Sequence, residues 1–266
     1  MVQQSNKVFG EGYEQDENGW FIFGRGDTER KSLWPPEHTL HPAKMPVPLY
    51  LAILEYVSER GQTVLDPFGG VGTSAIATLH GRKVLLCEVE DAFADIAQSA
   101  YDSWPEPKER LIIVRGDNRQ TLPLPCDHVI TSPPYAQTMV GGKNTSLAKD
   151  LYGDKALGQY QNKATNIGNL NPFFYSKAMD EVYDRVVQGV RPGGTISVVI
   201  KDQMQAGQRI ILSKPCMKSF ADRGWLVKDW FKHKPVASGF ANIQRSKGNE
   251  VVWEEDVIIF QRKEEL

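Results

Sequence analysis

A short buried strand followed by a glycine-rich turn constrains this chain more than any other feature. Residues 63–66 form an apolar run that ends in Asp66, residues 67–74 contain three glycines, and residues 75–79 read as the start of a helix. Strand, glycine turn and helix in this order make the first βα unit of a Rossmann-like sheet. The turn lacks both the G-x-G-x-x-G spacing of NAD-binding proteins and the G-x-x-x-x-G-K-[ST] spacing of a P-loop.

Strands and helices alternate along most of the chain after this turn. The alternation predicts an α/β fold with a Rossmann-like sheet of seven strands, mostly parallel, and helices on both faces. The last two strands are joined by a loop, so we expect them to form an antiparallel pair at one edge. The predicted strands are residues 63–66, 83–87, 111–114, 129–131, 195–200, 225–230 and 256–260, and the predicted helices are residues 47–60, 75–79, 92–104, 172–189 and 211–223.

We interpret residues 1–266 as one domain without internal repeats or an evident linker. Residues 1–32 are polar, acidic and rich in glycine, with one β-like patch at residues 20–23, and we expect a short hairpin or an arm laid on the domain. Residues 136–172 interrupt the alternation and are rich in Gly, Asn, Gln, Thr and Lys. A loop of this length in a compact domain is usually functional or disordered.

Several classes of protein are disfavoured by composition. No apolar run approaches the roughly 20 residues that span a bilayer, and residues 1–7 lack the apolar segment of a secretion signal. The three cysteines, Cys87, Cys126 and Cys216, are far apart and do not have metal-ligand spacing. We therefore expect reduced thiols in a cytoplasmic protein, no metal site and no membrane association.

Positive charge is concentrated in the C-terminal third. The whole chain has a formal net charge of −2, yet residues 191–249 contain eleven basic and three acidic side chains. Two interpretations are open: solvated helix faces, or a surface that contacts phosphates.

The predicted strand at residues 129–131 ends in Ser132, Pro133, Pro134 and Tyr135. The prolines lack N–H donors and have a fixed φ, so this segment cannot continue as a helix or a central strand. It forms an extended wall with carbonyl acceptors, a hydroxyl at one end and an aromatic ring at the other. Such a wall suits a planar group that carries an amine, although a structural Pro-Pro loop has the same sequence.

Four polar residues mark the carboxyl ends of predicted strands: Asp66, Glu88, Asp117 and Ser132. Ligands of open α/β sheets bind at this edge, near the switch in strand order. Glu88 lies 22 positions after Asp66, close to the spacing of about 20 expected for an acid that binds a ribose. A nucleotide-like ligand would then lie across these strand ends, with Glu88 on the ribose hydroxyls and Asp117 with Asn118 on the adenine edge.

In these residues the chain resembles the S-adenosylmethionine-dependent amino-methyltransferases of DNA, which modify N4 of cytosine or N6 of adenine. The family's cofactor motif, DPF-x-G-S-G-T, is similar to residues 66–73, which depart from it only at Val71. Its catalytic motif, (D/N/S)-P-P-(Y/F/W), is similar to residues 132–135, and an upstream HPA-type motif resembles residues 41–46. The cofactor motif precedes the catalytic motif, as in the family's gamma-type order.

The resemblance implies a methyltransferase-type sheet and S-adenosyl-L-methionine as the cofactor. Tyr135 would stack on a base flipped out of the duplex. The Ser132 hydroxyl and the Pro133 carbonyl would accept hydrogen bonds from the base's amine and aim its lone pair at the methyl group. The implied catalytic residues are Ser132, Pro133, Pro134 and Tyr135, and the implied cofactor-binding residues are His41, Pro42, Ala43, Lys44, Pro46, Asp66, Pro67, Phe68, Gly70, Gly72, Thr73, Ser74, Glu88, Asp117, Asn118 and Ser132.

The implied partner is double-stranded DNA, recognised through inserts at residues 136–172, 202–210 and 232–250. Serine in the first catalytic position is commoner among N4-cytosine members, so we expect N4 of cytosine, with N6 of adenine as the alternative. RNA or protein-amide methylation and a regulatory nucleotide-binding module are further interpretations. The chain carries no recognisable nuclease motif, so a cognate restriction endonuclease would be a separate chain.

A rival chemistry, cytosine-C5 methylation, needs a cysteine nucleophile, typically in a Pro-Cys pair. Pro125 and Cys126 form such a pair, but they precede the strand at residues 129–131 and so lie at the wrong end of the sheet. We expect Cys126 to be a turn residue. Trp225 and Trp230 are expected in the core.

Overall fold

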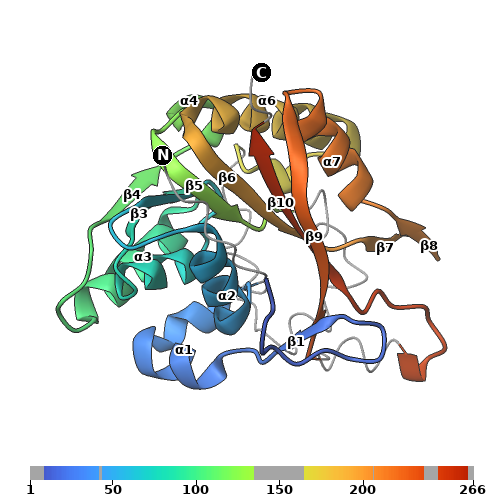
Figure 1. The fold of residues 1–266 in the computed structure, drawn as a ribbon, viewed down its shortest axis with the longest axis horizontal. Helices are drawn as coiled ribbons and strands as arrows, with labels where there is room; N and C mark the ends of the chain where they lie inside the picture. The colour runs from blue at the N-terminus through green and yellow to red at the C-terminus, as the bar shows by residue number, and fades with distance from the viewer. Residues whose placement is uncertain (1–8, 42–43, 135–164, 206, 237–244, 263–266) are drawn as a thin grey trace.

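The computed structural model describes residues 9–41, 44–134, 165–205, 207–236 and 245–262. Its centre is a twisted sheet of eight strands, beside which a two-stranded hairpin projects (Figure 1). The strands are β1 (Phe21–Phe23), β2 (Thr63–Asp66), β3 (Lys83–Glu88), β4 (Leu111–Arg115), β5 (Cys126–Thr131), β6 (Val190–Ile200), β7 (Gln203–Gln205), β8 (Gln208–Ile210), β9 (Trp225–Pro235) and β10 (Glu255–Arg262).

The main sheet has the order β1-β9-β10-β6-β5-β2-β3-β4. β10 runs antiparallel to both of its neighbours, and the other pairs are parallel. The predicted Rossmann-like α/β class and the antiparallel pairing of the last two strands are therefore confirmed.

The predicted number of seven strands and the edge position of the last pair are wrong. β1, from the N-terminal arm, pairs in parallel with β9 and places Phe21 opposite His233. The arm thus covers an edge of β9 whose backbone groups would otherwise be exposed. The residues expected to form a loop-like insert at 202–210 form the separate β7–β8 hairpin.

Helices cover both faces of the sheet. The core on one face includes side chains of α2 and α3, and the core on the other includes side chains of α6 and α7. Within the described ranges, none of the helices is both long and apolar enough to cross a bilayer. The α-helices are α1 (Asp27–Leu33), α2 (Val47–Val57), α3 (Asp91–Ser103), α4 (Asn118–Thr121), α6 (Pro172–Gly189) and α7 (Ser213–Ala221), and the 3-10 helices are η1 (Pro36–Leu40), η2 (Thr73–Thr78) and η3 (Ile167–Asn169).

The central strands are buried on both faces, which is why they read as continuous apolar runs. Successive side chains of β5 alternate between the two cores. Val129 packs in the core that contains α6 and α7, and Ile130 packs in the core that contains α2. Both side chains are fully buried.

The glycine turn after β2 differs from expectation in one respect. The helix predicted from residue 75 is the short 3-10 helix η2, because the chain must return to β3 at Lys83 within a few residues. Gly72 precedes it with φ 84°, and a Cβ atom there would lie 2.7 Å from the Cβ of Ala97 in α3. The turn therefore packs directly against α3.

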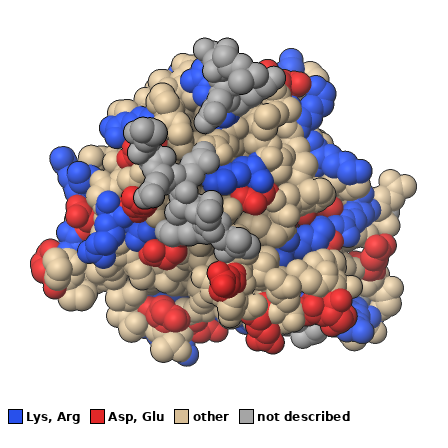
Figure 2. Space-filling model, viewed as in Figure 1, with Lys and Arg blue, Asp and Glu red and all other residues tan. Residues whose placement is uncertain are grey.

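Much of the positive charge in the C-terminal third is engaged in ion pairs. Among its eleven basic side chains, six form ion pairs with carboxylates, and several of those carboxylates come from other parts of the chain. The face drawn in Figure 2 shows basic and acidic groups interspersed among the described residues. The ion-paired residues are Arg191, Arg209, Lys218, Arg223, Lys232 and Lys234.

The prediction that both tryptophans lie in the core is correct for Trp225 and wrong for Trp230. Trp225 is 2% exposed, as predicted, whereas Trp230 is 50% exposed. Its indole Nε1 donates to Asp256 Oδ1 at 2.8 Å. The two tryptophans lie on the same strand, β9, where Leu226 and Val227 are exposed as well.

The packing of the glycine turn can be tested with a matched pair of substitutions. Gly72 and Gly61 both have a positive φ, but a Cβ on Gly61 would meet nothing within 4 Å. We expect Gly61→Ala to cost about 1 kcal/mol through backbone strain alone. Gly72→Ala should cost a further 1–3 kcal/mol or so, because the new methyl overlaps Ala97. Urea unfolding of both variants checks this, and equal losses would contradict the packing argument.

Candidate active site

A cavity of about 770 Å³ lies at the carboxyl ends of the strands, within the usual size range of small-molecule sites, roughly 300–1,000 Å³. The chain runs from β2 outward to β3 and β4 and then returns to β5 on the other side of β2. The strand order thus reverses between β2 and β5, where ligands of open sheets bind. The predicted site residues that line the cavity are His41, Lys44, Pro46, Asp66, Pro67, Phe68, Gly70, Thr73, Ser74, Glu88, Asp117, Asn118, Ser132, Pro133 and Pro134.

Within the described ranges, Gly72 is the one predicted site residue that does not line the cavity. Gly72 lies behind the turn against α3 and shapes it from there. Pro42, Ala43 and Tyr135 lie outside the described residues.

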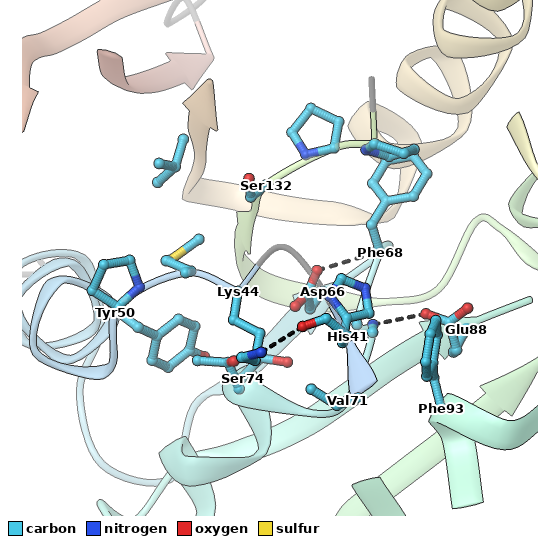
Figure 3. Close-up of a pocket in the computed structure, with 18 of the residues that line it drawn as sticks. His41, Lys44, Tyr50, Asp66, Phe68, Val71, Ser74, Glu88, Phe93 and Ser132 are labelled. Carbon is cyan, nitrogen blue, oxygen red and sulfur yellow. Dashed lines mark hydrogen bonds between the residues drawn. The ribbon is translucent and has the colours of Figure 1, made fainter. Parts of the chain in front are cut away.

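Asp66 connects the two strands at the switch point. Its Oδ1 accepts hydrogen bonds from the Thr131 hydroxyl at 2.9 Å and from the Phe68 N–H at 3.1 Å. Burial raises the pKa of Asp66, and these donors together with the Ser74 hydroxyl oppose the rise. Asp66 therefore links the start of the glycine turn to the end of β5 and fixes their relative position (Figure 3).

Glu88 ends β3 as a buried carboxylate that lines the cavity. Its Oε2 accepts from the Gly70 N–H at 2.7 Å and its Oε1 from the Glu90 N–H at 2.8 Å. Burial raises the pKa of Glu88 to about 7 in spite of these bonds. Each oxygen retains capacity to accept a further hydrogen bond, so Glu88 suits a ligand with two neighbouring hydroxyls.

Asp117 and Asn118 lie at the start of α4 on the same side. Burial acts to raise the pKa of Asp117, but hydrogen bonds from Arg119 outweigh it and the pKa is lowered. The Arg119 Nη2 lies 2.6 Å from Asp117 Oδ2. Asn118 donates through Nδ2 to the Pro67 carbonyl, and within the described structure its buried Oδ1 has no hydrogen-bond partner. Asn118 is thus the better placed of the two to accept a hydrogen bond from a ligand.

The HPA-type segment closes another wall of the cavity. The His41 ring meets Phe93 of α3 edge-on, with ring centroids 4.7 Å apart. A Cβ atom on Gly70 would lie 3.2 Å from His41 Nε2, so the ring rests against the glycine turn. Lys44 donates to the His41 carbonyl, and burial with a contribution from Arg30 lowers the pKa of Lys44 to about 8.

The proline wall follows β5, and α6 supports it. The Tyr175 hydroxyl donates to the Pro134 carbonyl at 2.6 Å. This corrects the expectation that the carbonyls of the wall are all free acceptors, since that of Pro134 is already engaged. Ser132 and Pro133 line the cavity beside Asp66.

Sequence reasoning missed several residues that line the cavity. Arg30 and Tyr50 come from α1 and α2, and Glu255 comes from the start of β10. No spacing pattern identifies them, because they reach the cavity through tertiary packing. Lys201, which directly follows β6, also lines the cavity, whereas Asp202 is paired with Arg209 of the β7–β8 hairpin at 2.8 Å.

The cysteine chemistry considered as a rival has no support in the geometry. Cys126 begins β5, at the end opposite Ser132, and is fully buried. It is a strand residue and not the expected turn residue. Burial raises the pKa of its thiol to about 12, which disfavours the thiolate that a nucleophile requires. Among the described residues, all cysteines are free thiols, and no group of three or more His, Cys, Asp or Glu side chains is placed to hold a metal ion.

Residues 5–99 match the model of a family of N6 and N4 methyltransferases described as DNA methylase. This segment contains the HPA-type residues, the glycine turn and Glu88, so the resemblance to amino-methyltransferases is confirmed there. No curated protein matches the chain.

Solved structures of methyltransferases share the fold. TrmN from Thermus thermophilus has a TM-score of 0.51 and 17% identity, over 86% of this chain and 52% of that protein, so this chain spans about half its length. A SAM-dependent methyltransferase from Methanosarcina mazei has a TM-score of 0.51 and 11% identity, over 80% of this chain and 98% of that protein. The glycopeptide N-methyltransferase MtfA has a TM-score of 0.51 and 10% identity, over 84% and 93% of the two chains. These likenesses show the fold alone.

The raised pKa of Glu88 predicts a specific dependence of stability on pH. A carboxyl whose pKa is higher in the folded state stabilises the fold when protonated, and this stabilisation is lost as the pH rises from about 4.5 to about 7. The loss is on the order of 3 kcal/mol, at about 1.4 kcal/mol per pKa unit. Urea unfolding between pH 5 and pH 8 should show this fall, and Glu88→Gln should remove it whatever constant offset the substitution adds.

Glu59→Gln is the control, because Glu59 is exposed and should leave the pH dependence as in the unsubstituted protein. If Glu88→Gln retained the original slope, the carboxyl would not be the group responsible.

Proposed function

We propose that this chain is an S-adenosylmethionine-dependent DNA amino-methyltransferase that modifies the exocyclic amine of a flipped base, with N4 of cytosine as the favoured acceptor and N6 of adenine as the alternative. One observation carries the proposal: the glycine turn after Asp66 and the wall at Ser132 meet in one cavity at the switch point of the sheet. The match of residues 5–99 to a DNA methylase family supports the substrate class.

The residues around the cavity fit this cofactor. The Glu88 carboxylate suits the ribose hydroxyls, and the buried Asn118 Oδ1, without a partner in the described structure, suits the amine of an adenine ring. The Gly70 backbone and the His41 ring pack against each other and form part of the cavity wall. When bound, the cofactor supplies a methyl group already activated on a sulfonium sulfur.

The chain's own residues then need only position the acceptor. Ser132 Oγ and the Pro133 carbonyl accept the two N–H groups of the base's amine, which localises the nitrogen lone pair and directs it toward the methyl group. The Pro134 carbonyl does not take part, because Tyr175 occupies it. The amine held by Ser132 and Pro133 would form the new nitrogen–carbon bond and release one proton to solvent, while the bound cofactor would supply the methyl group and keep the electron pair of the broken carbon–sulfur bond. Catalysis by orientation of this kind requires no covalent enzyme intermediate.

The cavity extends from Ser132 toward a polar pair on the neighbouring strands. Thr131 lies opposite Val198, and Ile200 lies opposite Asp256, so the alternation of side chains puts Ser132, Lys201 and Glu255 on one face of the sheet. All three line the cavity. Burial raises the pKa of Glu255, and Lys201 opposes this rise. We assign this part of the cavity to the ring of the flipped base.

The proposed partner is double-stranded DNA. Much of the inserts at residues 136–172 and 232–250 lies outside the described residues. The insert at 202–210 is the β7–β8 hairpin, whose Arg209 is held by Asp202 at 2.8 Å and by Glu254 at 2.6 Å. Arg209 is thus committed to ion pairs, which leaves the backbone and the remaining polar side chains of the hairpin for DNA contacts.

The role of Ser132 can be separated from cofactor binding. Ser132→Ala removes one acceptor for the amine, and we expect methyl transfer to duplex DNA to fall by about 100-fold or more. Binding of S-adenosylhomocysteine, measured by calorimetry, should change by less than about twofold. Ser103→Ala, on the exposed end of α3, serves as the control. Full activity of Ser132→Ala would overturn the assigned mechanism.

The identity of the acceptor can be read from the product. DNA incubated with the protein and S-adenosylmethionine should yield N4-methylcytosine on nucleoside digestion and mass spectrometry. N6-methyladenine in its place would select the alternative acceptor. Methylated RNA or protein with unmodified DNA would refute the proposed substrate class.

A further inference from the structure

Arg30 joins the N-terminal arm to the cavity. It lies on α1, is 4% exposed and lines the cavity, although none of the three family motifs contains it. Its Nη2 donates to the Met45 carbonyl and to the Thr73 hydroxyl, the latter at 3.1 Å. One guanidinium thus bridges α1, the HPA-type segment and Thr73 near the end of the glycine turn.

The position of α1 depends on a close approach that only glycine permits. Gly26 precedes α1 with φ 71°, and a Cβ atom there would lie 2.8 Å from Val47 Cβ and 2.9 Å from Pro48 Cδ. The arm therefore sits tightly against the start of α2. On its other side, the Arg30 guanidinium lies 5.5 Å from the centre of the buried Trp34 ring. The Arg30 side chain is therefore held by contacts on several sides.

Among the described residues, no carboxylate forms an ion pair with the Arg30 guanidinium. Its Nη1 is buried and has no hydrogen-bond partner among the described residues. Burial lowers the pKa of Arg30 to about 10, with Asp27 and Glu29 opposing the fall only from a distance. Lys44 is a second, half-buried cation nearby, and in the part of the chain that the structure describes neither residue forms an ion pair. Burying a cation without a counter-charge is costly, so the arrangement favours an anionic ligand.

The same end of the cavity holds another unused donor. The Tyr50 hydroxyl is buried without a partner in the described structure, and burial keeps the phenol protonated by raising its pKa well above 10. In Figure 3, Lys44 and Tyr50 lie on one side of Asp66, while Glu88 lies on the other. Donors and cations are therefore separated from the carboxylate that suits a ribose.

We propose that Arg30, with Lys44 beside it, binds the carboxylate of the cofactor's amino-acid portion, which makes the arm helix α1 part of the cofactor site. This rests on the proposed function. A DNA phosphate is the other anion that the protein would meet. Arg30 favours the cofactor, because a side chain 4% exposed beneath the arm cannot contact the backbone of a duplex.

Two ligands that differ in the amino-acid portion test the proposal. S-adenosylhomocysteine carries the carboxylate, and 5′-methylthioadenosine has the same nucleoside and sulfur without it. By calorimetry, Arg30→Gln should weaken binding of S-adenosylhomocysteine about 10- to 100-fold, the usual range for a hydrogen bond to a charged group. Binding of 5′-methylthioadenosine should change by less than about threefold. Arg60→Gln, at an exposed arginine, should affect neither ligand.

The possible results distinguish a failure of the role proposed for Arg30 from a failure of the proposed cofactor. Equal weakening of both ligands would mean that Arg30 only supports the fold, and unchanged binding of S-adenosylhomocysteine would overturn the proposal directly. If Arg30→Gln weakened only the binding of duplex DNA, the anion would be a phosphate. Arg30→Lys, which keeps the charge but not the planar fork, covers the case in which Arg30→Gln fails to fold, and it should show the same selective loss at a smaller size. Failure of the unsubstituted protein to bind either ligand would refute the proposed cofactor itself.

Discussion

The hydrogen bond between the Thr131 hydroxyl and Asp66 Oδ1 sets the geometry on which the rest of the site depends. The backbone ladder between β2 and β5 is short, with Val64 opposite His128 and Leu65 opposite Val129. Beyond it the two strands diverge, one into the glycine turn and the other into the proline wall. The side-chain bond holds these two segments together where the ladder no longer can. Because a buried carboxylate costs free energy unless it is hydrogen-bonded, the same bond that aligns the segments also makes Asp66 tolerable in the core.

Charge is divided between the two ends of the cavity. Glu88 lies toward one end, where only backbone N–H groups contact it, and Arg30 and Lys44 lie toward the other without carboxylate partners in the described structure. Pairing these groups with one another would neutralise them and remove any reason to bind a polar ligand. Because they are separated, the carboxylate at one end and the cations at the other can each interact with a ligand. In the proposed function, the two ends contact different parts of one elongated ligand. The free protein is therefore less stable than it would be with apolar residues at these positions.

The sequence predicted those elements whose signal is local. The strand at residues 63–66 was predicted with its exact bounds, because a short apolar run between glycines has few alternatives. Fifteen of the predicted site residues, taken from strand ends and motifs, line the cavity. β1 was missed as a sheet strand because it is three residues long and pairs with β9 more than 200 positions away. The Pro134 carbonyl was expected to be free because nothing local reveals Tyr175, which lies 41 positions further on. Pairings of this kind depend on how layers pack, which periodicity does not encode.

The N-terminal arm contributes an edge strand to the sheet and a helix, α1, beside the cavity. Its sequence is polar and acidic, and by itself it gives little reason to fold. Gly26 and Phe21 give it two anchors, one against the start of α2 and one in the ladder with β9. α1 begins directly after Gly26 and so has a defined position, from which Arg30 reaches the cavity with 4% of its surface exposed. We infer that this guanidinium serves the ligand and not the fold, since an apolar side chain there would pack without the cost of burying a charge.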